Sequence, residues 1–400
     1  MKVPLLDLTL QHRKLKKELR AAFARVLDHG KFILGPEMEL FEKETARLCR
    51  ARHAIACASG SDALLLSLMA LGVGPGDEVI TSPYSFFATA SCIARLGARA
   101  VFADISLCCY NLDPAEVLKK ISPRTRAILP VHLYGQSADM RPYLQPAKER
   151  GIPVVEDAAQ AIGAELNGRP VGALGEVGCL SFFPTKNLGG LGDGGMLLTN
   201  NAGLAEKLRI LRVHGAQPKY YHQALGINSR LDTLQAALLR VKLRHLRGWT
   251  EARKRNAALY VQLIVKAGLA NPPVSSRRDR GCVNDDTDGR LRKPLVLPVC
   301  CQSNHVYNQF VIRLANPAAR NALRRHLQSK GVGAEIYYPV PLHLQKCFDG
   351  WGYRAGDFPK SEQAAATTLA LPIFPELSGK QLRHVVKSLG SFDWKSFKNI

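Results

Sequence analysis

The chain contains 400 residues, 46% of them hydrophobic, and carries a formal net charge of +22 at pH 7. This length predicts a soluble globular protein with a large core and two or three domains. The most apolar stretch, 63–72, is too short to span a membrane, and the N-terminus lacks the apolar core of a secretion signal. A cytoplasmic location without a membrane partner is therefore expected.

The cysteine and charge patterns restrict the possible partners. Ten cysteines, including the pairs Cys108-Cys109 and Cys300-Cys301, show neither a dense disulfide framework nor the C-x-x-C spacing of a zinc site. We therefore expect no metal. The positive charge is spread along the chain instead of gathered into one tail, which argues against nucleic acid as the partner and suits an anionic substrate.

The periodicity of the apolar residues predicts alternating helices and strands in the first two thirds of the chain. The predicted helices span 10–29, 37–48, 63–71, 114–121, 204–213 and 233–264. The predicted strands span 54–58, 78–81, 100–104, 127–132, 152–157, 177–183 and 196–199. Such alternation predicts the α/β class, with a mainly parallel sheet and helices on both of its faces.

The pattern changes near residue 245, which predicts a large domain over 1–245 and a smaller C-terminal α/β domain over 246–400. The segment near 275–304 is irregular and polar, as in an exposed insertion. The ordered parts that follow it are predicted to be a strand at 308–313, a helix at 318–330 and a strand at 334–337.

Two loops at strand ends are candidates for ligand binding. Ser59-Gly60-Ser61-Asp62 begins a helix, so its backbone amides could bind an anion, although an ordinary capped helix start has the same sequence. Tyr84, Phe86 and Phe87 follow the strand 78–81, where a flat ring could stack on one of them. Core packing is the alternative for these aromatic residues.

Lys186 lies between a strand and the glycine-rich run Gly189-Gly-Leu-Gly-Asp-Gly-Gly195, and Asp157 ends the strand 152–157. Strand ends of one α/β sheet can converge, and pyridoxal phosphate needs such a pair. A lysine amine forms the Schiff base, and an anion keeps the pyridine nitrogen protonated. The alternative is a solvated lysine in a flexible turn.

The motifs Glu156-Asp-Ala-Ala-Gln160 and Ser181-Phe-Phe-Pro-Thr-Lys-Asn187 resemble those of the DegT/DnrJ/StrS family of sugar aminotransferases. The resemblance extends from Pro4-Leu-Leu-Asp-Leu8 to Tyr338-Pro-Val-Pro-Leu-His343. It implies a fold-type I pyridoxal phosphate enzyme that transfers an amino group, with glutamate as the expected donor, to a keto-sugar on a nucleoside diphosphate. The motifs are closer to those of members that aminate a 3-keto sugar than to those of 4-keto members.

The resemblance also implies a role for each matching residue. Lys186 is assigned to the Schiff base and to proton transfer, and Asp157 to the pyridine nitrogen. The other assigned cofactor contacts are Gln160 at the ring hydroxyl, Phe86 stacked on the ring, and Gly60, Ser61 and Ser181 at the phosphate, with Asn228 reaching the phosphate from the second subunit of a homodimer with shared sites. His343 is a candidate sugar contact, with a structural role as the alternative. The family often has histidine where this chain has Ile162, which affects the expected substrate contacts.

Two other functions stay open at this stage. One is a pyridoxal phosphate transaminase that acts on another ketone. The other is a regulatory nucleic-acid binder that keeps the fold without the activity, because the chain is strongly basic.

Overall fold

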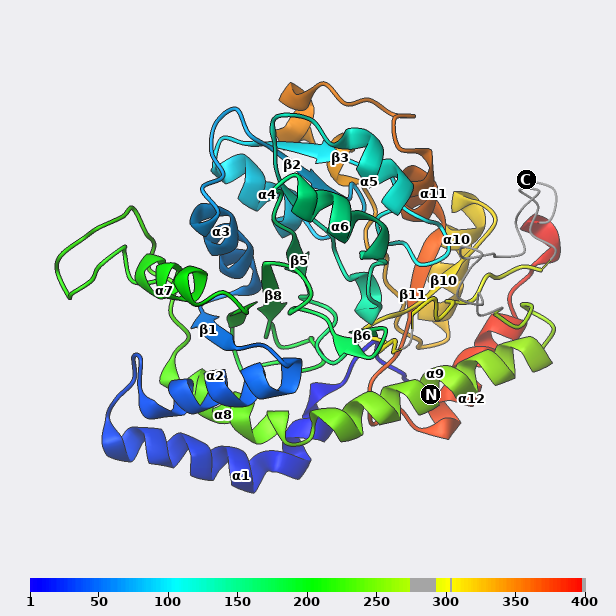
Figure 1. Ribbon diagram of the computed structural model, residues 1–400. Helices are drawn as coiled ribbons and strands as arrows, with labels where there is room; N and C mark the ends of the chain where they lie inside the picture. The colour runs from blue at the N-terminus through cyan, green and yellow to red at the C-terminus, as the bar shows by residue number, and fades with distance from the viewer. Residues whose placement is uncertain (274–292, 303, 398–400) are drawn as a thin grey trace.

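The computed structural model describes residues 1–273, 293–302 and 304–397 (Figure 1). Most of the predicted insertion near 275–304 therefore lies outside the described residues. Among the residues that are described, no helix is long and apolar enough to cross a membrane.

Within the described residues, a sheet of seven strands forms the centre of the molecule. Its strands are β1 (His53–Cys57), β2 (Glu78–Thr81), β3 (Arg99–Phe102), β4 (Thr125–Leu129), β5 (Val155–Asp157), β8 (Val177–Ser181) and β9 (Gly195–Thr199). The ladders give the orders β3-β2-β4 and β5-β8-β9-β1, and the parallel bridges Ile128↔Val154 and Val131↔Asp157 join the two parts. Among the described ladders of these seven strands, the two pairings of β9, with β8 and β1, are antiparallel and the others are parallel. The prediction of a mainly parallel sheet is therefore confirmed.

Helices cover both faces of this sheet. The helices of this part of the chain are α1 (Leu8–His29), α2 (Pro36–Cys49), α3 (Gly60–Ala70), α4 (Ala88–Arg95), α5 (Pro114–Lys120), α6 (Arg141–Glu149), α7 (Ala202–Leu211) and α8 (Thr233–Leu243). The short turn η1 (Leu133–Gly135) and the small hairpin of β6 (Glu165–Leu166) and β7 (Arg169–Pro170) belong to the same part. Alternate residues of β1 pack to opposite sides, because side chains in a strand have period two. Ile55 packs in a core cluster with Leu66 of α3, and Ala56 in another with Phe41 of α2.

The first helix is amphipathic, as its sequence predicts. Leu15, Leu19, Ala22 and Val26 form its buried stripe and pack against α8. Asp7 caps its start and accepts from the backbone N–H of Thr9, and the chain leaves it through a left-handed glycine. The charged residues between these positions lie on its exposed side.

The predicted continuous helix 233–264 is wrong, because it consists of α8 and a separate helix α9 (Leu246–Lys266). α8 packs against α1 and α2, whereas α9 packs against α12 (Gly379–Gly390). The later part of α9, with Ala257, Tyr260 and Ile264, packs in a core cluster that contains no residue of α8. The chain changes direction at Arg244 and His245, between the two helices (Figure 1). The predicted domain boundary at 245/246 falls at this break and stays a prediction.

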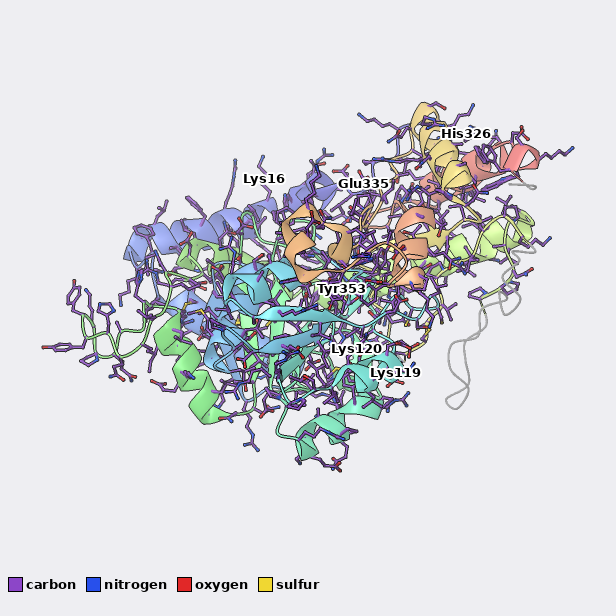
Figure 2. All side chains as sticks on the ribbon, turned by 90° about the horizontal axis from the view of Figure 1, so that it is seen from above. Lys16, Lys119, Lys120, His326, Glu335 and Tyr353 are labelled. Carbon is purple, nitrogen blue, oxygen red and sulfur yellow. The ribbon has the colours of Figure 1, made fainter. Side chains whose placement is uncertain are left out.

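A second core lies between α9 and the C-terminal elements. These elements are β10 (Phe310–Arg313), α10 (Pro317–Ser329), η2 (Leu342–Leu344), η3 (Lys346–Trp351), α11 (Pro359–Thr367), β11 (Thr368–Leu371), α12 and η4 (Lys395–Phe397). β10 and β11 form an antiparallel pair, and α10 lies beside α12 (Figure 2).

The predicted strand at 334–337 is wrong, since only Glu335 forms a bridge, with Ala370. The Glu335 carboxylate accepts from the next backbone amide, that of Ile336, and so competes with strand pairing. The chain then returns to the large sheet. There the hydroxyl of Tyr353, labelled in Figure 2, donates to the carbonyl of Ala100 at 3.2 Å.

Candidate active site

Lys186 is held by a compact turn that follows β8. Its backbone N–H donates to the Phe183 carbonyl at 2.8 Å. A Cβ on Gly189 would lie 2.1 Å from the Pro184 carbonyl oxygen, so only glycine fits where the turn closes on itself. The turn that follows Lys186 is therefore closely packed at Gly189.

Asp157 occupies the corresponding end of β5. Its Oδ2 accepts from the Thr89 hydroxyl at 2.9 Å, and its Oδ1 accepts from the backbone N–H of Ala159 at 3.2 Å. Burial raises the pKa of Asp157, against the opposing effects of these hydrogen bonds and of the positive charge of Lys186. Burial lowers the pKa of Lys186 to about 8, and the negative charge of Asp157 opposes this shift.

β5 and β8 are adjacent and parallel, so their C-terminal ends meet at one edge of the sheet. This edge brings together Asp157 and Lys186, as their positions in the sequence predict. The two groups interact electrostatically, because each shifts the pKa of the other. The arrangement combines a carboxylate with an amine that is partly neutral near pH 8.

The N-terminus of α3 lies beside the same sheet edge. A Cβ on Gly60 would come within 2.6 Å of the Ser181 Cβ, and a Cβ on Gly195 within 2.2 Å of the Ser59 carbonyl oxygen. Ser59 caps α3 by accepting from the Asp62 backbone N–H at 3.0 Å, while the first-turn amides of Gly60 and Ser61 have no intrahelical acceptor. Such a turn can bind a phosphate group.

Gln160 and Phe86 both lie near Tyr338. The Gln160 side chain accepts from the Tyr134 backbone N–H at 2.7 Å and donates to the Tyr338 hydroxyl at 3.0 Å. The ring of Phe86 is 54% exposed and lies 6.0 Å from that of Tyr338. Phe87 instead stacks on Phe348 at 5.5 Å, which is the packing role that the sequence left open.

Asn228 is exposed, and the next residue ties this segment to the start of α3. The Ser229 hydroxyl donates to Asp62 at 2.7 Å and accepts from the backbone N–H of Ala58 at 3.1 Å. Asn228 is thus close in sequence to a contact with the α3 N-terminus of its own chain. Its assignment to the phosphate of a second subunit stays a prediction.

His343 lies in an aromatic cluster, with its ring 4.8 Å from that of Phe358. Its Nε2 is 3.1 Å from a carboxylate oxygen of Glu362, and the residue is buried. This environment supports the structural alternative, and the sugar contact stays a prediction. Ile162 is buried in the core cluster that contains Phe182.

Sequence reasoning missed the contacts of two groups near the end of β5. Thr89 lies on α4, a helix that was not predicted, so its contact with Asp157 had no local signal. The other group is Glu156, whose two oxygens accept from His132 Nε2 at 2.9 Å and from the backbone amides of Gly172, Leu174 and Gly175. The acidic pair at the strand end indicated a special position, but the partners of Glu156 are distant in sequence.

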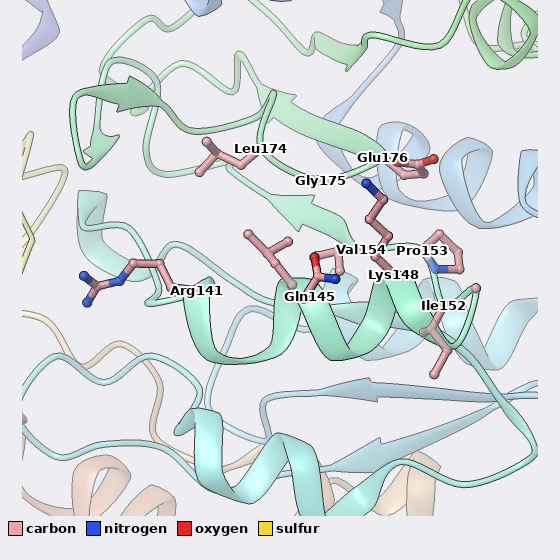
Figure 3. Close-up of a pocket in the computed structure, with 11 residues that line it drawn as sticks. Arg141, Gln145, Lys148, Ile152, Pro153, Val154, Leu174, Gly175 and Glu176 are labelled. Carbon is pink, nitrogen blue, oxygen red and sulfur yellow. The ribbon is translucent and has the colours of Figure 1, made fainter.

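A separate cavity of about 640 Å³ lies between α6 and the chain leading into β5 and β8 (Figure 3). Lys148, Val154 and Glu176 are among the residues that line it. Val154 and Glu176 directly precede the two strands, whereas Asp157 and Ser181 end them. The cavity is therefore at the opposite edge of the sheet and is not part of the candidate site.

The residues at the C-terminal edge fit pyridoxal phosphate. A buried carboxylate can face the ring nitrogen, a lysine amine can hold the cofactor, and a helix start without room for a Cβ at Gly60 can bind the phosphate. The fold and this edge define a fold-type I pyridoxal phosphate enzyme.

Residues 13–390 match the model of the DegT/DnrJ/EryC1/StrS aminotransferase family. The chain belongs to this family. It is 47% identical to the "Pleiotropic regulatory protein" of Geobacillus stearothermophilus, over 98% of this chain and 99% of the relative. It is also 40% identical to the UDP-N-acetyl-3-dehydro-alpha-D-glucosamine 3-aminotransferase of Acidithiobacillus ferrooxidans, over 96% of each chain.

Solved structures agree with this assignment. DesV of S. venezuelae, crystallised with a ketimine intermediate, has a TM-score of 0.88 and 40% identity, covering 100% of this chain and 99% of that one. NtdA of Bacillus subtilis, crystallised with the cofactor PMP, has a TM-score of 0.85 and 30% identity, covering 97% of this chain and 84% of its own. The protein is therefore a pyridoxal phosphate-dependent enzyme of the nucleotide-sugar aminotransferase family.

Proposed function

We propose that this enzyme transfers the amino group of glutamate to the 3-keto position of a sugar carried on a nucleoside diphosphate. The observation that carries the chemistry is the meeting of Lys186 and Asp157 at one sheet edge. The 3-keto preference is supported by the relative from Acidithiobacillus ferrooxidans, whose name places its reaction at that position. The positive charge of the chain suits an anionic nucleotide-linked substrate.

When bound, the cofactor would supply an electron-accepting ring for the bond that breaks at the donor's Cα. Asp157 keeps a proton on the ring nitrogen by placing a negative charge there. Lys186 Nζ takes the proton from the donor Cα and returns one to the cofactor side, as general base and then acid. Its lowered pKa suits this exchange near neutral pH.

We also propose a homodimer with shared active sites. The loop that contains Tyr220, Tyr221 and Leu225 extends away from the rest of the chain (Figure 1), and Leu225 is 94% exposed. Phe32 and Ile33 are also exposed large apolar residues. Exposed apolar groups of this kind are typical of a surface that a protein partner covers. Asn228 directly follows this loop and would contribute to the phosphate site of the partner.

The substrate is tested with purified enzyme, glutamate and a set of nucleotide-linked 3-keto and 4-keto sugars, with amino-sugar formation followed by mass spectrometry. We expect preferential turnover of a 3-keto sugar, and preferential turnover of a 4-keto sugar would overturn the regiochemistry. Turnover of ketones that lack a nucleotide, but not of nucleotide sugars, would favour the alternative of a transaminase for another ketone.

The residue roles are tested with Lys186→Ala and Asp157→Asn. Lys186→Ala should abolish turnover and the cofactor linkage that borohydride reduces, and peptide mapping of the wild type should locate that linkage at Lys186. Asp157→Asn should lose several orders of magnitude in turnover, because an amide does not hold the ring nitrogen protonated. Near-normal activity in the second variant would remove Asp157 from the mechanism.

The shared site is tested by mixing Lys186→Ala and Asn228→Asp subunits. Each homodimer should be nearly inactive. A mixed dimer has one site with Lys186 from one chain and Asn228 from the other, so random mixing should recover up to about a quarter of wild-type activity. Verified mixed dimers without recovered activity would show that Asn228 does not act across the interface.

The regulatory alternative is favoured by one observation, the name of the relative from Geobacillus stearothermophilus. The nucleic-acid binder considered from the sequence would not transfer an amino group from glutamate. The screen with glutamate therefore separates the two functions.

A further inference from the structure

Two buried hydroxyl groups connect in a line to Asp157. The Thr89 Oγ1 lies 2.9 Å from Asp157 Oδ2, and the Ser85 Oγ lies 2.9 Å from Thr89 Oγ1. The side chain of Thr89 is fully buried, and Ser85 is 3% exposed. Both residues lie between the end of β2 and the first turn of α4.

The chemistry of the groups fixes the direction of these hydrogen bonds. An ionised carboxylate only accepts, so the single hydroxyl hydrogen of Thr89 points to Asp157. The Thr89 oxygen must then accept from the Ser85 hydroxyl. The backbone N–H of Ala159 donates to the other carboxylate oxygen. Each oxygen of Asp157 therefore has one donor whose position the protein fixes.

The surroundings of Thr89 give no packing reason for a hydroxyl group. Its helix neighbours Ala88, Ala90 and Ile93 are all buried and apolar. A buried hydroxyl without a partner destabilises a fold, and a residue such as valine would fill the same volume. The partner that offsets this burial is Asp157.

We propose that Thr89, supported by Ser85, is a positioning residue that keeps the Asp157 carboxylate ionised and in one orientation toward the ring nitrogen of the cofactor. The proposal rests on the proposed role of Asp157. It adds two residues to the machinery of this enzyme, and neither of them needs to touch the cofactor or the substrate.

The hydrogen bond from Thr89 acts against burial, which raises the pKa of Asp157. The other titratable groups that interact with this carboxylate are Lys186 and His132, which lower its pKa, and Cys92, Cys179 and Tyr338, whose own pKa values its charge raises. Thr89 is the strongest of the groups that favour the ionised form. Removal of its hydroxyl should therefore favour the protonated carboxyl.

The test uses Thr89→Val, which keeps the shape and removes the donor, and Thr89→Ser, which keeps the donor. Ser85→Ala removes only the supporting bond. Thr45→Val is the matched control, because Thr45 is also fully buried and its hydroxyl has no partner among the described residues. Circular dichroism establishes that each variant is folded.

The first readout is the pKa of Asp157 in the cofactor-free protein, from the carboxyl ¹³C signal of labelled aspartate, assigned with Asp157→Asn. Thr89→Val should raise this pKa by about one to two units, the effect of losing a hydrogen bond to a charged group. Ser85→Ala should raise it by less, and Thr89→Ser and Thr45→Val should leave it near the wild-type value. An unchanged pKa in Thr89→Val would overturn the proposal.

The second readout is the pH dependence of cofactor binding to the same proteins. In Thr89→Val the loss of affinity on acidification should begin at higher pH than in the wild type, and Thr89→Ser should restore the wild-type profile. If Thr89→Val does not fold, Ser85→Ala decides, and an unshifted profile and pKa in that variant overturn the proposal. If the pKa shifts as expected but Asp157→Asn keeps full activity, the proposed function of Asp157 fails while the link from Thr89 stands.

Discussion

Replacing Glu156 by glutamine should strongly destabilise the protein. The Glu156 side chain is fully buried, and each of its oxygens accepts two hydrogen bonds. Oε1 accepts from the amides of Leu174 and Gly175, and Oε2 from the amide of Gly172 and from His132 Nε2. In glutamine an NH₂ group takes the place of one oxygen and would face the two hydrogen-bond donors that this oxygen accepts from in Glu156.

The variant therefore loses two hydrogen bonds to a charged acceptor and leaves buried donors without partners. Each such bond contributes about 1.5–3 kcal/mol, and a neutral amide costs less to bury than a carboxylate, which offsets part of the loss. The free energy of unfolding should therefore fall by about 3–5 kcal/mol. The pH dependence gives a second signature. Burial raises the pKa of Glu156, but the hydrogen bonds and His132 outweigh it and hold that pKa below its usual value.

A lowered folded-state pKa means that the unfolded chain binds the proton more tightly. The stabilisation by Glu156 should thus be complete above the unfolded pKa of 4.5 and be lost as the pH falls through the folded value. Urea unfolding of the cofactor-free protein measures both effects. Glu116→Gln is the matched control, because Glu116 is a partly exposed member of a surface ion pair with Lys119 and should contribute less than about 1 kcal/mol. Equal effects of the two substitutions would refute the reasoning.

Three further predictions concern the cofactor site. Lys186 has a pKa of about 8, so at pH 7.5 its neutral fraction should be roughly 200 times that of an ordinary lysine. A limiting amount of an amine-acylating reagent should therefore label Lys186 before other lysines in the cofactor-free protein. Peptide mass spectrometry measures the order of labelling. Asp157→Asn should speed this labelling, because the charge of Asp157 raises the Lys186 pKa, and slower labelling would contradict that coupling. Gly60→Ala should weaken cofactor binding about tenfold or more in a titration, because its Cβ would lie 2.6 Å from the Ser181 Cβ. Gly74→Ala is the control and should bind the cofactor normally, because a Cβ at Gly74 would lie in open space.

The fold class could be predicted because the period of the apolar residues records which faces each element buries. Ile55 and Ala56 are consecutive residues that pack on opposite sides of the sheet, and β1 is apolar from Ala54 to Cys57 for that reason. The break between α8 and α9 was missed, since both halves continue the same helical pattern. β11 was missed because it follows α11 without a turn residue between them.

Some residues of the candidate site could likewise be predicted from the sequence, and others could not. Asp157 and Lys186 are recognisable because a charged residue at the end of an apolar strand is unusual and because strand ends of a parallel sheet converge. The hydrogen bonds made by Thr89, His132 and the amide of Gly172 join segments that are distant in sequence. Nothing in the local sequence of these residues indicates their partners. The packing of the whole sheet creates these contacts.

The position of β1 has a consequence for the order in which the chain acquires structure during synthesis. Among the described residues its only ladder partner is β9, with His53 opposite Thr199. β1, the first strand of the sheet to be synthesised, therefore cannot pair until β9, the last, has been synthesised. The turn from β1 into α3, with Gly60, completes its packing only when Gly195 arrives beside Ser59. A nascent chain should consequently gain affinity for the cofactor late, once β9 has emerged, and cofactor capture would mark the end of folding of the large sheet.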